Sequence, residues 1–392
     1  MPPERSRNVN ELIQHYRKLR GYTQDQLAVL AGVSVSHISK IEQGRKHPSP
    51  GTVNALADAL KVHPAVLNGQ PYVEELEDDK LHELVQPLRA ALDLYDIPPD
   101  MPTRDRADLA AAADQLCARV RRTELRAVAA ALPALLQEAT TAAHTGRTDG
   151  DWATLASLFR TAYDVAAKLG YHDLSSLALE RMAWAAERAS DATVVAMRQY
   201  MRALVHMRSG TYTPGQQLIL SGHTLLEQAE PGRVRDVLTG QLHLGQAVLA
   251  ARSADAATAE EHLREAARFA EITGEAGRVH WLSFGPTNVE VHRVSTLVEM
   301  CRDTEAVEVA RRIEFPVDWA PSRIAHHHCE VAKALTWTGH RDEAFGRLLE
   351  AKRIAPQQTR HFPQARAVLD DLVDAARTSE DTLAGLARWF GR

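Results

Sequence analysis

The sequence predicts an all-α protein that combines a small N-terminal helical domain with a long body of helical hairpins. Aromatic residues make up only 5% of the 392 residues, and much of the apolar content is alanine, the strongest helix former. From Arg104 onward, amphipathic stretches of helical length alternate with short breaks that contain Gly or Asp. That region lacks the alternating pattern of a half-buried strand.

Residues that cap and stop helices divide the N-terminal segment into five short helices. Thr23 and Ser34 are suitable N-caps, whereas Gly32 and Gly44 can take the positive φ that often ends a helix. The predicted helices are, in order, Asn8 or Asn10 to Arg20, Gln24 to Ala31, Ser34 to Gln43, Pro48 or Pro50 to Leu60, and Pro64 to Leu67.

The second and third predicted helices are joined by a tight turn at Gly32, as a helix-turn-helix motif requires. The segments 23–28, 32–34 and 38–44 together resemble the Cro/phage-repressor (XRE) family, and 56–60 and 66–69 resemble that family's closing helices. The resemblance covers about residues 8–70. It implies a helix-turn-helix domain that binds double-stranded DNA.

The resemblance also implies roles for single residues. Gln24 would hold a DNA phosphate, Lys40 could reach guanine, and Val35 could touch a thymine methyl group. Taken singly, the basic residues can equally be solvated surface charges. The predicted DNA-binding residues are Arg17, Gln24, Ser34, Val35, Ser36, Ser39, Lys40, Arg45 and Lys46.

Charge is unevenly distributed along the chain. Residues 1–72 hold nine Lys or Arg and five Asp or Glu, a net charge of +4, whereas the remainder carries a net charge of −9. A basic domain on an acidic body is consistent with one part that touches nucleic acid and one that does not. The expected division is 1–72 for DNA binding, 73–103 for an acidic linker with a helix at 81–94, and 104–392 for the body.

Small apolar residues recur within the body at a fixed spacing. The clearest unit, residues 325–358, has the small residues and the terminal proline typical of a tetratricopeptide repeat of about 34 residues. Weaker units lie at 196–229, 238–272, 287–316 and 151–188. The sequence therefore predicts a tetratricopeptide-like α-solenoid, with helices at 360–377 and 380–390 as its cap.

In such a solenoid, exposed positions of the first helices line a concave groove. Asn288 follows Gly285 and Pro286, so its amide either contacts a bound peptide or caps the helix. The predicted ligand-binding residues are Tyr200, Thr239, Gln246, Asn288, Val291, Ser295, His326, Cys329 and Lys333.

Metal and catalytic sites are not expected. His326, His327 and His328 are consecutive, and consecutive helical side chains point about 100° apart, so they cannot converge on one ion. Phosphate-binding loops and nucleophile motifs are missing, so we expect neither cofactors nor an enzyme. The three cysteines lack CxxC spacing, and no apolar run is long enough for a signal or a membrane span, so a cytoplasmic protein is expected.

The layout is similar to actinobacterial XRE regulators with a tetratricopeptide-like C-terminus, and to the peptide-pheromone receptors of Gram-positive bacteria. That similarity implies a homodimeric transcriptional regulator whose activity is modulated by a small peptide or a metabolite. The alternative is a DNA-bound adaptor whose solenoid binds a protein partner. The apolar helices at 105–145 and 360–390 are candidate dimer surfaces.

Overall fold

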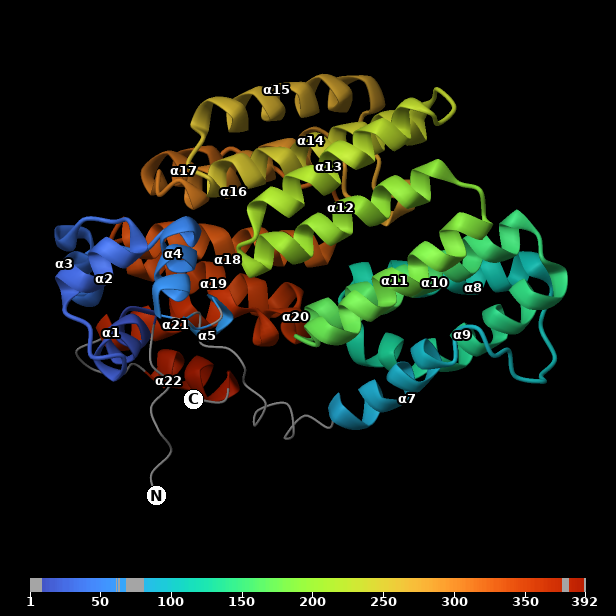
Figure 1. Ribbon diagram of the computed structural model, residues 1–392, viewed down its shortest axis with the longest axis horizontal. Coiled ribbons are helices and arrows are strands. Elements are labelled where there is room, and N and C mark those ends of the chain that lie inside the picture. Colours follow the sequence, from blue (N-terminus) through green and yellow to red (C-terminus); the bar gives the residue numbers. More distant parts are fainter. Residues whose placement is uncertain (1–8, 61, 63, 68–80, 376–380, 391–392) are drawn as a thin grey trace.

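The computed structural model describes residues 9–60, 62, 64–67, 81–375 and 381–390. Helices dominate, and the only β pairing among these residues is an isolated antiparallel bridge between Ala276 and Phe284. Figure 1 shows a small N-terminal domain at one end of a longer body of stacked helices. The all-α prediction is therefore confirmed. None of the described helices is long and apolar enough to cross a membrane.

The N-terminal domain contains the five predicted helices. Helix α1 begins at Val9, so Asn10 lies within its first turn instead of capping it, and Asn8 is outside the described residues. Residues 73–80 of the predicted linker also lie outside them. The helices are α1 (Val9–Leu19), α2 (Gln24–Ala31), α3 (Val35–Glu42), α4 (Pro50–Leu60) and α5 (Pro64–Leu67).

Local capping explains why α2 and α3 begin where they do. The Thr23 hydroxyl accepts a hydrogen bond from the Gln26 amide at 3.1 Å, and the Gln26 side chain accepts one from the Thr23 amide at 2.8 Å. Gly32 ends α2 with a φ of 65°, a conformation that costs little only for glycine. The turn then leads directly to Ser34, whose hydroxyl caps α3.

Five antiparallel hairpins build the body, and each corresponds to one predicted repeat. The first helices contact one another in sequence, α12 with α14, α14 with α16 and α16 with α18, so they form the inner layer. The hairpins are α10 (Asp149–Lys168) with α11 (His172–Arg188), α12 (Ala192–Ser209) with α13 (Tyr212–Glu227), α14 (Arg233–Arg252) with α15 (Ala256–Thr273), α16 (Pro286–Glu299) with α17 (Asp303–Ala310), and α18 (Pro321–Trp337) with α19 (Arg341–Ile354).

Further helices extend the array at both ends. Helix α7 packs against α9, and α21 packs against α18 and α19. The N-terminal additions are α7 (Leu81–Asp93), α8 (Arg106–Arg121) and α9 (Leu125–Gly146), and the C-terminal ones are α20 (Pro356–His361), α21 (Pro363–Ala375) and α22 (Asp381–Trp389). The described parts of the two predicted terminal helices correspond to α21 and α22.

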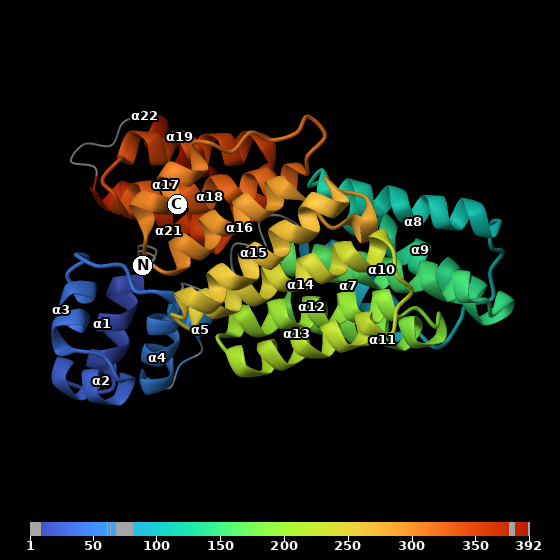
Figure 2. The same ribbon diagram turned by 90° about the horizontal axis from the view of Figure 1, so that it is seen from above.

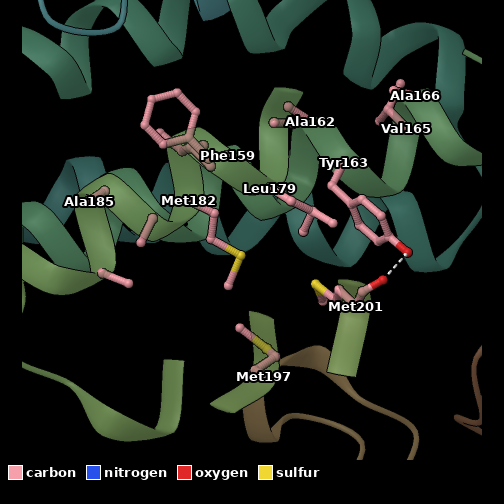
Figure 3. Packing of buried hydrophobic residues seen from close by; sticks show 14 of the residues in the cluster. Phe159, Ala162, Tyr163, Val165, Ala166, Leu179, Met182, Ala185, Met197 and Met201 are labelled. Atoms are coloured by element: carbon pink, nitrogen blue, oxygen red, sulfur yellow. Dashed lines mark hydrogen bonds between the residues drawn. The ribbon is translucent and has the colours of Figure 1, made fainter. Parts of the chain in front are cut away.

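Thioether and aromatic side chains fill the space between successive hairpins (Figure 3). Phe159 of α10 and Met182 of α11 are fully buried, and Met197 of α12 packs into the same cluster. The Tyr163 hydroxyl donates a hydrogen bond to the Met201 carbonyl at 3.5 Å. Burial of these large side chains holds consecutive pairs together along the solenoid.

The body curls back on itself, because its two ends are in contact. Helix α8 packs against α18, and Figure 2 shows α8 beside the C-terminal half of the body. The Arg126 amide donates to the Gln357 side chain at 3.0 Å, and the Lys168 ammonium donates to Gln358 at 3.2 Å. The inner layer of first helices is consequently enclosed by the chain itself.

Candidate functional site

The predicted recognition face lies on α3, at the end of the molecule away from the body (Figure 1). Val35 is 39% exposed, Ser36 and Lys40 are exposed, and Ser39 lies between them at half-buried depth. These positions follow the helical period, so their side chains share one face of α3. Arg45 and Lys46 are exposed just beyond the helix.

Two of the predicted DNA-binding residues are fixed by a carboxylate inside the domain. Glu42, whose side chain is only 1% exposed, accepts hydrogen bonds from the Arg17 guanidinium at 2.6 Å and the Gln24 amide at 2.8 Å. Burial raises the pKa of Glu42, but the bonds from Arg17 and Gln24 outweigh that effect, and the net pKa is below its usual range. The network ties α1 and α2 to α3 and so fixes the orientation of the recognition helix.

The end of α3 carries a further polar contact. The Lys46 ammonium lies 3.2 Å from Nδ1 of His37. Burial lowers the pKa of His37, and the charges of Lys46 and Lys40 lower it further. A neutral imidazole here accepts a hydrogen bond from Lys46 and leaves the exposed face with the positive charges of Lys40, Arg45 and Lys46.

The N-terminal domain is attached to the body through the start of α4. The Asn54 amide donates to the Tyr212 hydroxyl at 2.6 Å, and the imidazole of His47 stacks on the indole of Trp337 with a centroid distance of 4.5 Å. Burial holds the pKa of His47 well below its usual range, and the nearby Lys333 ammonium adds to this. The contact surface on the body is made by the ends of α12, α14 and α18 and the start of α13.

The predicted ligand-binding residues lie on first helices of the hairpins, but most of them are buried. Val291 and Cys329 are 0% and 1% exposed and pack between helices. Thr239 donates to the Arg235 carbonyl within its own helix, and the buried Oε1 of Gln246 has no partner among the described residues. Lys333 is also buried, next to His47 of the N-terminal domain.

Three of the predicted ligand-binding residues come together between α16 and α18. The Ser295 hydroxyl donates to Glu330 at 2.5 Å, and Nε2 of His326 lies 3.3 Å from the same carboxylate. The Asn288 side-chain oxygen accepts a hydrogen bond from Arg323 at 3.0 Å. Tyr200 is in a separate contact, where its hydroxyl accepts a bond from Gln241 at 2.8 Å.

The sequence prediction missed four cations of the inner layer, Arg121, Arg160, Lys168 and Arg323. Arg160 is only 5% exposed, in the middle of an otherwise apolar stretch of α10. A charged residue at such a position is a signal in the sequence, because an arginine is rarely buried without a role. Arg121 and Arg323 could not be found in this way, since they come from α8 and α18.

Comparison with known proteins identifies relatives of the N-terminal domain. Residues 13–67 match the family model described as helix-turn-helix. Over 50 residues the chain is 42% identical to the uncharacterized HTH-type transcriptional regulator YazB of Bacillus subtilis strain 168, a span of 13% of this chain and 72% of YazB. It is 36% identical over 73 residues to the HTH-type transcriptional repressor RghR of the same strain. That span is 18% of this chain and 54% of RghR, about half of the repressor's length.

A solved structure aligns with most of the chain. This is the crystal structure of Bacillus thuringiensis PlcR in complex with the peptide PapR7 and DNA, with 14% sequence identity and a TM-score of 0.32 over 94% of this chain and 99% of PlcR.

Proposed function

This chain belongs to the XRE-type helix-turn-helix family of transcriptional regulators, and on that premise we propose that it binds a specific operator in double-stranded DNA. In this proposal, residues 1–72 bind DNA, 73–103 form the linker, and 104–392 sense an effector and carry the dimer contacts. The observation that carries it is the exposed polar and basic face of α3, a helix that lies at the end of the molecule away from the body.

The proposed contacts combine base readout and backbone attachment. Val35, Ser36, Ser39 and Lys40 enter the major groove, where Lys40 reaches guanine and Val35 contacts a thymine methyl. Ser34, Arg45 and Lys46 attach to phosphates. Gln24 and Arg17, which the Glu42 carboxylate orients, approach the backbone at the start of α2.

Each chain carries one recognition helix, so a homodimer is proposed to read two half-sites of an inverted repeat. Half-sites of such motifs lie about 34–36 Å apart, one turn of the duplex. One candidate dimer surface, the region 105–145, can offer a partner only the residues that the chain does not bury itself. Within 105–145, the leucines of α9 are buried against the chain's own helices, so a partner would contact the outer residues of that region.

We further infer that a small peptide or a metabolite bound on the inner layer modulates DNA binding. The support is the shared location: the predicted ligand-binding residues lie on α12, α14, α16 and α18, and the ends of α12, α14 and α18 adjoin the N-terminal domain. An effector acts only if it binds two arrangements of these helices with different affinity.

The test is to incubate the purified full-length protein with fragmented genomic DNA at near-physiological salt and to sequence the retained fragments. Enrichment of one inverted repeat is expected. Uniform retention that disappears as salt is raised would mean that only attraction to the phosphates is present, and it would contradict a specific regulator. Co-purification of a stoichiometric protein with the bound complex would favour the adaptor function over the effector-responsive one.

A further inference from the structure

Four cationic side chains converge on the inner layer of the solenoid. Arg121 ends α8, Arg160 and Lys168 lie on α10, and Arg323 is in the first turn of α18. We call these residues the inner cationic cluster. They come from the two ends of the body that the curl of the solenoid brings into contact.

Geometry and electrostatics agree that these groups are neighbours. The guanidinium groups of Arg121 and Arg160 both donate to the carbonyl of Trp281. Burial lowers the pKa of Lys168 to about 8, and the charges of Arg121, Arg323 and Arg160 contribute to that shift. Burial and the charges of Arg160 and Arg323 likewise lower the pKa of Arg121 to about 9.

The surrounding acidic groups do not balance this charge. Asp164 is the one carboxylate that favours the charged forms of both Arg121 and Lys168, and it lies 3.5 Å from Arg160. Glu330 interacts electrostatically with Arg323 but is also engaged by Ser295 and His326, and Asp114 accepts a hydrogen bond from the Trp281 indole. Arg160 is buried and the other three cations are half-buried, and an excess of positive charge withdrawn from water is costly unless a counter-ion compensates it.

Apart from the ion pair of Arg160 with Asp164, the cluster is paired with neutral oxygen atoms. Lys168 donates to Gln358 at 3.2 Å, and Arg323 donates to Asn288 at 3.0 Å. Arg160 donates to the His280 carbonyl, while its buried Nε has no acceptor among the described residues. Neutral acceptors satisfy hydrogen bonds but do not compensate charge.

The carbonyls of His280 and Trp281 belong to residues 275–285, the segment between α15 and α16, which we call the strap. It crosses from the outer hairpins to α8, α10 and α12, where Nε2 of His280 lies 3.1 Å from the Thr193 hydroxyl. Both His280 and Trp281 have positive φ, 43° and 51°, which is strained for residues other than glycine. The arginines therefore hold the strap in a conformation that it would not adopt by itself.

We propose that the inner cationic cluster is a binding site for a small polyanion, whose charged oxygens replace the strap carbonyls on Arg121 and Arg160. The shared ligand chemistry is two or more phosphate or carboxylate groups on one small molecule. Bidentate guanidinium contacts suit both groups, and the unpaired Nε of Arg160 supplies a further donor. The claim that the anion regulates DNA binding rests on the proposed function, whereas the claim that the cluster binds an anion does not.

The position of the cluster would let a bound anion affect the N-terminal domain through α18. A polyanion would bridge α8 and α10 to α18. The far end of α18 carries Trp337, which stacks on His47 of the N-terminal domain, and Lys333, whose charge acts on His47. Anion binding that tightens the existing contact between the two ends of the body would thus change how the body holds the DNA-binding domain.

The test is isothermal titration calorimetry of the full-length protein with two probes, inorganic pyrophosphate and citrate, at constant ionic strength in chloride. One-to-one binding of at least one probe is expected. Binding of pyrophosphate alone would assign a phosphorylated ligand, and binding of citrate alone a polycarboxylate. If neither probe binds, the proposal is wrong.

Variants locate the binding. Arg160→Gln and Lys168→Gln should each weaken binding by at least about tenfold, because each removes a charged hydrogen-bond donor. Arg264→Gln, an exposed arginine on α15, and Lys40→Ala on the recognition face should leave it unchanged. Equal binding by all four variants would place the anion elsewhere. If Arg160→Gln does not fold, Lys168→Gln decides the outcome.

Hydrogen exchange of the strap provides a second readout. Amides of residues 276–284 should exchange faster when the anion is bound, because their anchoring carbonyl contacts are lost. Binding without faster exchange would overturn the displacement of the strap. DNA retention is measured on the same preparation without anion. Failure to retain DNA would contradict only the proposed function, whereas failure to bind either anion would contradict only the proposed anion site.

Discussion

The imidazole of His47 stacks on the indole of Trp337, with ring centroids 4.5 Å apart and an angle of 27° between the planes. His47 lies between α3 and α4 of the N-terminal domain, and Trp337 is the last residue of α18 in the body. Together with the hydrogen bond from Asn54 to Tyr212, the stack joins the recognition helix to the inner layer of the solenoid.

Trp337→Leu should loosen this attachment. An aromatic pair contributes about 0.5–1.5 kcal/mol beyond its buried area, so amide exchange across residues 47–54 should accelerate by up to about tenfold. Mass spectrometry of hydrogen exchange measures this. Trp184→Leu, which also loses aromatic contacts but lies on α11, should leave residues 47–54 as they are. Unchanged exchange in Trp337→Leu would mean that the stack does not hold the domain.

The same contact should weaken in acid. Burial keeps the pKa of His47 well below 6.5 in the docked domain, and Lys333 adds to the shift. A released imidazole has its ordinary pKa of about 6.5, so docking is fully favourable above that pH and is progressively lost as pH falls below it. Exchange at residues 47–54 should therefore be faster at pH 5 than at pH 7.5, after correction for intrinsic rates.

His47→Phe separates this effect from others, because phenylalanine stacks on Trp337 without titrating. Burial also raises the pKa of the nearby Asp303 to about 6, with Lys333 opposing the shift, so Asp303 titrates in the same pH window. The difference between the wild type and His47→Phe reports on His47 alone. An identical pH response in both proteins would assign the effect to Asp303 or to another group.

Lys40→Ala should relax base preference, whereas Gln24→Ala should weaken binding to all sequences alike. A lost bidentate base contact typically costs about 1–3 kcal/mol of discrimination, a factor of roughly 5 to 150 at the affected base pair. The measurement is affinity for the enriched operator and for single-base variants of it at one fixed salt concentration. Arg264→Ala removes a charge from α15 and is the control for non-specific electrostatics. Unchanged operator binding in both Lys40→Ala and Gln24→Ala would show that the recognition surface is wrongly assigned.

Gly240→Ala should destabilise the body and the strap. A Cβ atom at position 240 would lie 2.0 Å from the ring of Phe284, the fully buried residue that fixes the strap to α14. Overpacking of this kind typically costs about 1–3 kcal/mol. The control is Gly346→Ala on α19, where nothing lies within 4 Å of the added atom and the better helix propensity should raise stability slightly. Equal thermal midpoints for the two variants would contradict the close approach of Phe284.

The sequence by itself determined which segments are helices and how neighbouring helices pair. Thr23, Gly32 and Ser34 act through bonds within a few residues, so α2 and the start of α3 were predictable to the residue. Small residues at the repeat spacing, such as Ala344 and Ala351, are buried where α18 and α19 meet, for the same local reason.

Only the tertiary structure decided what faces the inside of the solenoid. The curl that brings α8 to α18 is the sum of small rotations between hairpins, and the repeat pattern does not encode that sum. It buries Val291 and Cys329, two of the predicted ligand-binding residues, and it gathers Arg121 and Arg323 from positions about two hundred residues apart. Packing of large side chains over long sequence separations determines this closure, and with it the charge that the interior must balance.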